Sequence, residues 1–345
     1  MMLILGMETS CDETAMAVID ENKNILSHVV FSQIDIHKEF GGVVPEIAAR
    51  NHVSVIDKVL ELTLKKASVT VDDVDAIGVT TGPGLIGGVL VGALFAKTIA
   101  SIKKKPLIAV NHLEGHALIC CLTDNIKFPF LLFLLSGGHC QILEVSGIGQ
   151  YRKFGETIDD ALGECFDKVG KMLGLEYPAG LKIEEFAKLG DENRFNFTMP
   201  LINKSKNKEE NKFNFSFSGL KTAIKIAINK INTVTEQDKN DICASFQHIV
   251  TKILVNRLEN ILNISDLDKG IRDIVISGGV AANQYIKNGM REVCVKYGYN
   301  LITPPTDLCT DNGVMIANVA LERYKLGKIS DLLITPKSKW ELEEL

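Results

Sequence analysis

The sequence lacks the Cys-x-x-Cys pattern of redox and metal-binding sites. Its eight cysteines are scattered along the chain. This absence argues against a disulfide framework. Several cysteines lie in apolar runs, such as residues 118–121. We therefore interpret them as small core residues of a protein in a reducing compartment.

The sequence also lacks a large excess of charge of either sign. The formal net charge is −5 over 345 residues, so the chain has no general basic field for coating a nucleic acid. A nucleic-acid partner would need a local basic patch, and the residues 103–105 and Lys221 are candidates for one. The alternative is that these lysines are ordinary solvated charges.

We expect no targeting or membrane-spanning segment either. The first strand is expected at residues 3–7, with no basic or hydrophobic leader before it. The most hydrophobic window, residues 85–102, contains three glycines and Lys97, which favours a buried helix over a membrane span. We expect a cytoplasmic protein with no membrane partner.

The chain has enough apolar residues for two domains, since 46% of it is hydrophobic. Residues 3–7 and 15–19 predict a hairpin, and residues 130–135 and 141–145 repeat the same plan. We therefore expect a duplicated architecture with two lobes, 1–130 and 131–345, and a last helix that returns toward the first lobe.

Strands and helices alternate along both halves, which predicts an α/β fold. A polar stretch, residues 203–212, is expected to be a surface loop. The expected strands are 76–80, 107–110, 273–276 and 301–303. The expected helices are 53–67, 159–173, 182–189, 239–262, 280–297 and 311–324. A further helix is expected to begin at residue 85.

The best candidate for a metal site is His112-Leu113-Glu114-Gly115-His116. Histidines four residues apart share one face of a helix and can offer two imidazoles to one ion. Metalloproteases place their general-base glutamate directly after the first histidine, whereas Glu114 is two residues after it. The pattern therefore predicts a metal site and disfavours a protease; histidines satisfied by packing or solvent are the alternative.

A second dense segment is residues 8–14, which holds three acids and three hydroxyl groups. Asp12 and Glu13 are candidates for metal, phosphate or acid-base chemistry, and a solvated turn is the alternative. Asp311 opens the last expected helix, where an aspartate serves equally well as a helix cap or as a third metal ligand.

Three glycine-rich turns could approach a ligand. Residues 82–87 match Gly-x-Gly-x-x-Gly, but the next strand ends in Asn111 instead of the acid that a dinucleotide site needs, which favours a tight turn. The turn at 136–139 could bind phosphate through its backbone. The junction at 277–283 could receive a ring or ribose beside Asn283, or could serve helix packing alone.

Taken together, these segments resemble the bacterial TsaD (Gcp) family of tRNA threonylcarbamoyltransferases, which have the two-lobed fold of actin, Hsp70 and the sugar kinases. The matches keep their order over nearly the whole chain, at residues 8–14, 41–46, 82–88, 112–116, 136–139, 155–160, 166–168, 214–222, 277–283 and 309–313.

The resemblance implies that His112, His116 and Asp311 bind one divalent metal ion, usually iron, with zinc as the alternative. It implies that the ion holds the substrate, threonylcarbamoyl-AMP, in a cleft between the lobes. We further hypothesise that Asp12 orients the substrate or accepts a proton from the amine. The implied contacts of the adenylate are Leu134, Leu135, Ser136, Gly137, Gly138, Asp167, Gly180, Glu184 and Asn283.

The implied reaction moves the threonylcarbamoyl group to N6 of the adenosine just 3′ of the anticodon, in tRNAs that read codons beginning with A. AMP leaves. Members of the family work with a paralogous subunit of the same fold (TsaB) and a small ATPase (TsaE). The alternatives are an ATP-dependent kinase or ATPase of this fold, which would favour oxygen ligands for Mg²⁺, and a scaffold paralogue, which would lack the metal ligands.

The chain departs from the family pattern at two places. Ala179 and Leu181 stand where the family usually has glycine and proline, and an alanine that needed a positive φ would cost roughly 1 kcal/mol. Glu184 stands where many members have an aspartate that touches the ribose.

Overall fold

The computed structural model describes residues 1–201, 211–265 and 267–345, so positions 203–210 of the expected polar loop lie outside the described residues. The chain forms two compact units. Unit 1 comprises Met1–Ile126, Gly147–Gln150 and Thr310–Leu345, and unit 2 comprises Lys127–Ser146 and Tyr151–Cys309. The last helix therefore belongs to unit 1.

Unit 1 is built on a five-stranded sheet with the order β3-β2-β1-β4-β5. The first three strands form antiparallel pairs, and β4 and β5 run parallel to β1. All residues of β1 are buried, which explains its continuous apolar run. The strands are β1 (Leu3–Glu8), β2 (Glu13–Asp20), β3 (Ile25–Ser32), β4 (Ala76–Gly82) and β5 (Leu107–Asn111).

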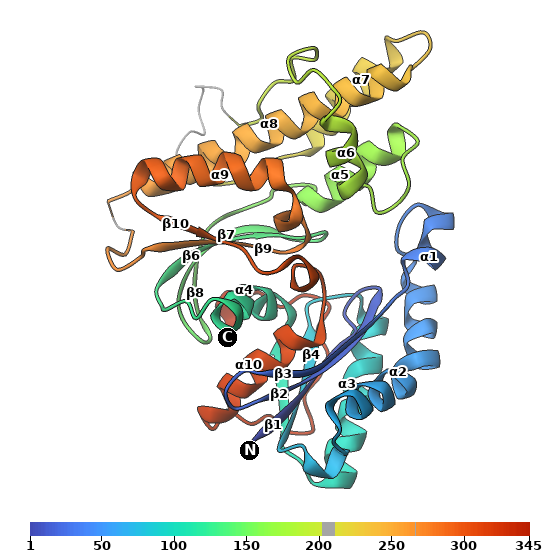
Figure 1. Cartoon of the computed structure of the whole chain (residues 1–345), viewed down its shortest axis with the longest axis vertical. Coiled ribbons are helices and arrows are strands. Elements are labelled where there is room, and N and C mark those ends of the chain that lie inside the picture. The colour runs from blue at the N-terminus through green and yellow to red at the C-terminus, as the bar shows by residue number, and fades with distance from the viewer. Residues whose placement is uncertain (202–210, 266) are drawn as a thin grey trace. The chain divides into compact units, whose positions relative to one another are not determined.

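Helices cover both faces of this sheet (Figure 1). The short helix α1 (Ile34–His37) precedes α2 (Pro45–Ala67), and α2 and α3 (Ile86–Lys103) pack on one face. On the other face, α10 (Gly313–Lys325) packs on β1, β2 and β4 and contacts α4 (His112–Thr123). The carboxyl end of β1 and the start of α4 thus belong to one packed unit.

Helix α3 is buried on one side only. By length and composition alone it could cross a membrane, with a mean hydropathy of 1.5 over 18 residues, of which 33% are buried. Gly88 and Gly92 bring it against Thr9, where a Cβ at either position would overlap the threonine. Its opposite side exposes Ile86, Leu90 and Leu94.

After α10 the chain returns along the sheet of unit 1. The amide of Ser330 donates to the carbonyl of Leu107 at 2.8 Å, and that of Lys337 donates to Thr81 at 2.8 Å. Gly82 has a φ of +143°, and a Cβ there would overlap the backbone of Lys337. This approach accounts for the first glycine of the Gly-x-Gly-x-x-Gly pattern without a dinucleotide.

Unit 2 repeats the sheet of unit 1. Its order is β10-β9-β6-β7-β8, in which an antiparallel β6-β7 hairpin pairs through β6 with the parallel strand β9. This match confirms the predicted duplication. The strands are β6 (Phe130–Leu135), β7 (Cys140–Gly147), β8 (Gln150–Glu156), β9 (Asp273–Ser277) and β10 (Asn300–Ile302).

The helices of unit 2 surround a core of buried aliphatic and aromatic side chains. They are α5 (Leu162–Met172), α6 (Gly180–Ala187), α7 (Ser218–Asn229), α8 (Glu236–Leu262) and α9 (Gln284–Tyr297). The continuous helix expected over 280–297 is wrong. A 3-10 helix, Gly279–Ala282, ends at Asn283, whose backbone is extended and whose side chain caps α9.

Candidate functional site

Helix α4 presents the two histidines of the candidate metal site. Strand β5 ends at Asn111, whose side-chain oxygen accepts hydrogen bonds from the amides of Leu113 (2.8 Å) and Glu114 (3.4 Å). This cap starts the helix at His112. The rings of His112 and His116 lie one turn apart, with centroids separated by 4.8 Å. Both side chains are buried.

Asp311 comes from the turn just before α10. Asn312 caps that helix by accepting from the amide of Met315 at 2.9 Å, so the alternative of Asp311 as the cap is wrong. A Cβ at Gly313 would overlap the backbone of Met16. The glycine therefore lets the turn lie directly against β2, and the carboxylate of Asp311 is left to face α4.

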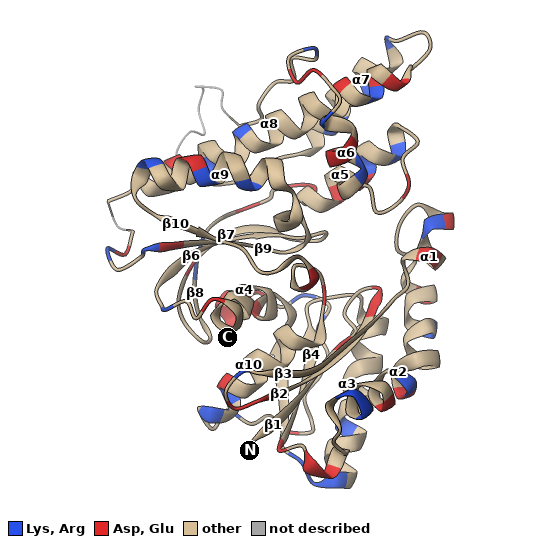
Figure 2. Ribbon diagram, in the orientation of Figure 1, with Lys and Arg blue, Asp and Glu red and all other residues tan. Residues whose placement is uncertain are grey.

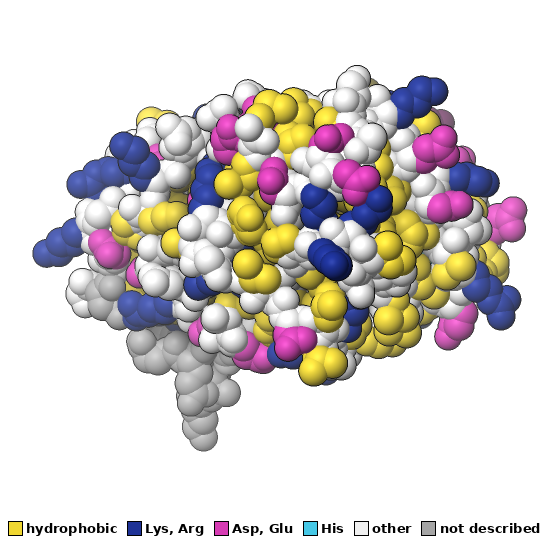
Figure 3. Space-filling view, turned by 90° about the horizontal axis from the view of Figure 1, so that it is seen from below, with side chains coloured by type: hydrophobic (Ala, Val, Ile, Leu, Met, Phe, Trp, Pro, Cys, Tyr) yellow, Lys and Arg dark blue, Asp and Glu magenta, His cyan; other side chains and the backbone are white. Residues whose placement is uncertain are grey.

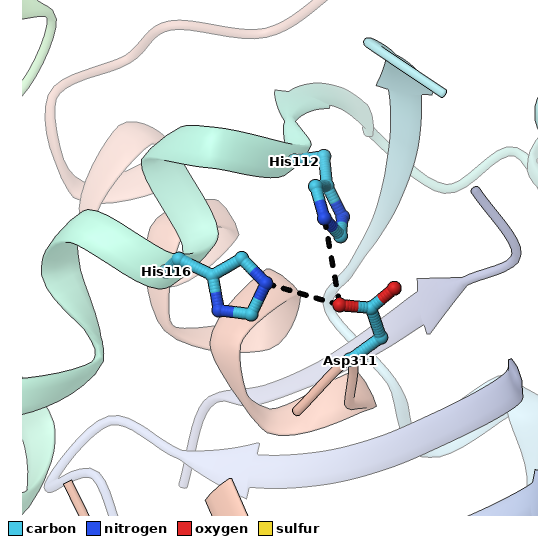
Figure 4. Close-up of side chains that lie close together, drawn as sticks. All are labelled: His112, His116 and Asp311. Carbon is cyan, nitrogen blue, oxygen red and sulfur yellow. Dashed lines mark hydrogen bonds and ion pairs between the residues drawn. The ribbon is translucent and has the colours of Figure 1, made fainter. Parts of the chain in front are cut away.

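The three side chains converge on one point (Figure 4). Oδ1 of Asp311 lies 3.0 Å from Nε2 of His116 and 3.5 Å from Nε2 of His112. One ligand atom from each residue lies within 4.8 Å of the others. Two imidazole nitrogens and one carboxylate suit a divalent ion with open coordination positions. The residues present therefore fit a metal ion.

The electrostatics of the group also favour a cation. Burial opposes a positive charge on His112, but the carboxylates of Asp311 and Glu8 outweigh it and raise the pKa of His112 to about 9. The carboxylates beside His112 thus stabilise positive charge at this group, whether a proton or a metal ion carries it.

Glu8 is a site residue that the sequence reasoning missed. It is the last residue of β1 and is fully buried, with Oε2 3.0 Å from Nδ1 of His112. It also accepts hydrogen bonds from the amide of Ser10 and the hydroxyl of Thr80. The signal that could have found it is an acid at the end of an otherwise apolar, buried strand.

Asp12 is the last residue of the segment that joins β1 to β2, and Glu13 is the first residue of β2. Asp12 is buried, and its backbone carbonyl accepts from the amide of Gln33 at 3.1 Å. Burial raises the pKa of Glu13 well above its usual value, and the charges of Asp12 and Asp311 raise it further. The hydrogen bond with the side chain of Asp12 acts in the same direction on the pKa of Glu13.

Glu114 takes no part in the metal group. Its Oε2 lies 2.6 Å from Nη2 and 2.9 Å from Nε of Arg323 on α10, and its Oε1 accepts from the amide of Gly149 at 3.0 Å. It ties α4 to α10 and cannot act as the general base of a protease.

In unit 2, the first candidate substrate residues end β6 and form the next turn. Leu134 and Leu135 are the last residues of the strand. The carbonyl of Ser136 accepts from the amide of Gly163, at the start of α5, at 3.2 Å. Gly278 has a φ of +93°, and a Cβ there would lie 2.5 Å from the carbonyl oxygen of Leu135. The turns at 136–138 and 277–279 are therefore neighbours.

The remaining candidates are joined by hydrogen bonds within unit 2. Asp167 on α5 accepts from the amide of Ala179 at 2.8 Å, and Glu184 on α6 accepts from the amide of Gln284 at 3.0 Å.

The side chain of Asn283 is occupied by the protein. Its oxygen accepts from the amide of Ile286 at 3.0 Å, and its nitrogen donates to Gln247 at 2.8 Å. The oxygen and the nitrogen of this side-chain amide thus both form hydrogen bonds within the protein. Fewer hydrogen bonds of Asn283 remain for a ribose or a ring.

Three candidates are glycines that face open space. A Cβ at Gly137, Gly138 or Gly180 would meet no atom within 4 Å. Ala179 has a φ of −88°, so the strain that a positive φ would cause is absent at this alanine. A Cβ at Gly170 would overlap the side chain of Ala179, so the glycine at 170 makes room for it.

Comparison with known proteins identifies related sequences over the full length. The family model described as TsaD, tRNA N6-adenosine threonylcarbamoyltransferase, matches residues 24–318. A protein of that name from Rickettsia rickettsii (strain Sheila Smith) is 49% identical, covering 100% of this chain and 99% of its own length. Another from Rickettsia bellii (strain OSU 85-389) is 48% identical, covering 99% of each chain.

Comparison with solved structures gives the fold. HypF from T. kodakarensis superposes with a TM-score of 0.60 at 14% identity, covering 94% of this chain and 48% of that one. Component A of (R)-2-hydroxyglutaryl-CoA dehydratase from Acidaminococcus fermentans has a TM-score of 0.55 at 16% identity, covering 94% and 99%. These likenesses confirm the predicted fold class, the two-lobed fold of actin, Hsp70 and the sugar kinases.

Proposed function

This chain belongs to the TsaD family of tRNA N6-adenosine threonylcarbamoyltransferases, and we propose that it catalyses that transfer. The donor is threonylcarbamoyl-AMP, the acceptor is N6 of the adenosine immediately 3′ of the anticodon, and AMP is released. The observation that carries this proposal is the full-length identity of 49% together with the convergence of His112, His116 and Asp311. A scaffold paralogue would have no use for that group.

The metal proposed for the His112, His116 and Asp311 group is iron(II), with zinc as the alternative. A bound divalent ion supplies Lewis-acid stabilisation for the negative charge on phosphate and carbamoyl oxygens. The protein would supply two imidazole nitrogens and one carboxylate oxygen to hold the ion. A kinase or ATPase site for Mg²⁺ would be built from oxygens instead.

The adenylate is proposed to bind on unit 2. The open turn at Gly137 and Gly138 supplies backbone amides to the phosphate with no Cβ in the way. Gly180, which also faces open space, starts α6 and lets the ribose approach the backbone. Glu184 is buried beside the amide of Gln284 and replaces the usual aspartate at the ribose.

Asp12 is proposed to take the proton in the transfer step. A bond forms between N6 of adenosine and the carbamoyl carbon, the bond from that carbon to the phosphate oxygen breaks, and AMP leaves with its electrons. The proton lost from N6 goes to the carboxylate of Asp12.

The proposed protein partners are a TsaB-like paralogue and a TsaE-like ATPase, in the cytoplasm. The exposed stripe Ile86, Leu90 and Leu94 on α3 supports a protein partner, because these side chains recur every four residues along one helical face. Figure 3, seen from below, shows hydrophobic side chains exposed between Lys, Arg, Asp and Glu side chains. We assign the stripe to the paralogue.

The lysines expected to meet tRNA are poorly placed for it. Lys103 pairs with Asp72 at 2.9 Å, and Lys221 pairs with Asp160 at 2.6 Å. Lys103 also ends α3, whose 18 residues span about 27 Å from the end that packs on Thr9. Figure 2 shows Lys and Arg interspersed with Asp and Glu along helices such as α9. We therefore do not assign these lysines to the anticodon region.

The function is tested in cells depleted of this protein and supplied with variants. Nucleoside mass spectrometry should show loss of threonylcarbamoyladenosine from tRNA, restoration by the wild type, and no restoration by His112→Ala. The matched control is His28→Ala, at a histidine of β3 outside the metal group. Unaltered threonylcarbamoyladenosine after depletion would refute the proposed function.

A further inference from the structure

Glu8, the last residue of β1, is a fully buried acid in unit 1. A buried carboxylate persists only where donors replace its water. Here the donors are the amide of Ser10, the hydroxyl of Thr80 and Nδ1 of His112.

The contact with His112 determines which ring nitrogen faces the metal group. Nδ1 lies 3.0 Å from Oε2 of Glu8, and that carboxylate oxygen can only accept, so Nδ1 carries a proton. In a neutral His112, Nε2 then has no proton, and its lone pair is available to a metal ion. Nε2 is also the nitrogen that faces Asp311. A carboxylate behind a metal-binding histidine fixes its tautomer and orientation in this way.

The second histidine is held differently. Nδ1 of His116 is buried and has no hydrogen-bond partner among the residues that the structure describes. Its ring is oriented only by packing and by the contact of Nε2 with Asp311 at 3.0 Å. Of the two imidazoles, therefore, only that of His112 has a carboxylate at its Nδ1.

We propose that Glu8 is a positioning residue that keeps His112 protonated at Nδ1 and aimed through Nε2, and thereby sets the affinity and coordination geometry of the metal site. The inference rests on the metal site of the proposed function. Glu8 acts through His112 and touches neither substrate nor ion.

The test measures metal binding directly, with Co²⁺ as a spectroscopic probe. The whole chain is stripped with a chelator and titrated with Co²⁺, and the visible d–d bands report both affinity and coordination geometry. Glu8→Gln keeps the size of the side chain and removes its charge. We expect a 10- to 100-fold weaker affinity and altered bands, as for other partners behind metal-binding histidines.

The matched control is Thr14→Val. Thr14 forms a neighbouring buried hydrogen bond, 2.7 Å from Nδ1 of His52, and neither residue belongs to the metal group. This variant loses a comparable buried contact and should keep the wild-type affinity and bands. Circular dichroism checks that each variant is folded.

A measurement on the wild type covers the case in which Glu8→Gln does not fold. With ¹⁵N-labelled histidine and bound Zn²⁺, the His112 signals, assigned by their loss in His112→Ala, should show a proton on Nδ1 and coordination through Nε2. Coordination through Nδ1, or wild-type affinity and bands in folded Glu8→Gln, would overturn the inference. If the wild type binds no metal, or His112→Ala binds as the wild type does, the proposed metal site fails instead.

Discussion

Arg323 on α10 forms an ion pair with the fully buried Glu114 on α4, with Nη2 2.6 Å from Oε2. The pair joins the helix that carries both histidines to the helix that follows Asp311. We expect Arg323→Met to lower the free energy of unfolding by about 3–5 kcal/mol, because it leaves the buried charge of Glu114 without its guanidinium. Chemical denaturation measures this change.

The control for that prediction is Glu322→Gln, one residue away on α10. Glu322 pairs with Lys23 at 3.0 Å, and both side chains are partly exposed. Such a pair contributes about 0–1 kcal/mol. Equal effects of the two variants would show that the buried pair does not hold α4 against α10.

Asp159 gives unit 2 a stabilising contact that acid should remove. Burial would raise the pKa of Asp159, but hydrogen bonds from Ser216 and from the amides of Phe217 and Ser218 lower it below its usual value. A native pKa below the unfolded value of about 3.9 stabilises the fold above that pH, and the stabilisation disappears as the pH falls through the native pKa.

At pH 6 we therefore expect Asp159→Asn to be less stable than the wild type by about 1 kcal/mol, with faster hydrogen exchange at the start of α7. The difference should shrink between pH 4 and pH 2. Glu185→Gln, which breaks an exposed ion pair with Lys182, is the control. A difference that persists unchanged at pH 2 contradicts this role of Asp159.

Asp12→Asn tests the proposed proton acceptor. The single-turnover rate of transfer should fall at least 100-fold, because an amide cannot take the proton from N6. Binding of threonylcarbamoyl-AMP, followed by equilibrium dialysis, should persist. Asp35→Asn, at an exposed aspartate of the same unit, should keep the wild-type rate. A wild-type rate in Asp12→Asn would remove Asp12 from the mechanism.

Ala179 and Gly170 should behave as a coupled pair. Gly170→Ala should cost about 1–3 kcal/mol of unfolding free energy, because its methyl group would overlap that of Ala179. Adding Ala179→Gly should recover most of this loss. Additive effects in the double-mutant cycle, measured by denaturation, would mean that the two positions do not share the space.

The stripe on α3 is tested by Leu90→Glu. Binding of a purified TsaB-like paralogue, measured by calorimetry, should weaken at least 10-fold, because a charge would be buried in an apolar interface. Ile226→Glu, at an exposed isoleucine of α7, is the control. Equal binding by Leu90→Glu and the wild type would move the interface elsewhere.

The sequence predicted the central strands and long helices because their side chains are apolar at a clear period. Strands β3 and β8 escaped prediction because they are only partly buried, and β8 has two adjacent charged residues, Arg152 and Lys153, that interrupt an apolar pattern. The break at Asn283 was missed because the apolar residues of 280–297 keep a helical spacing throughout. In the structure, the side chain of Asn283 caps a new helix, α9, after the 3-10 helix has ended.

At the site, spacing predicted His112 and His116, since one helix carries both. Asp311 required the resemblance, because its approach depends on the contact of Gly313 with β2. Glu8 could not be assigned a role from local sequence, since its partner His112 is 104 residues away.

The division of the chain into units has a consequence for synthesis. Unit 1 ends with Thr310–Leu345, which follow the whole of unit 2 in the sequence. On the ribosome, α4 with both histidines emerges long before Asp311, and the α10 face of the first sheet stays uncovered meanwhile. Domains usually fold from the N-terminus onward. Here the second unit is translated to its end before the first can close, so Asp311 can meet His112 and His116 only after all of unit 2 has been made.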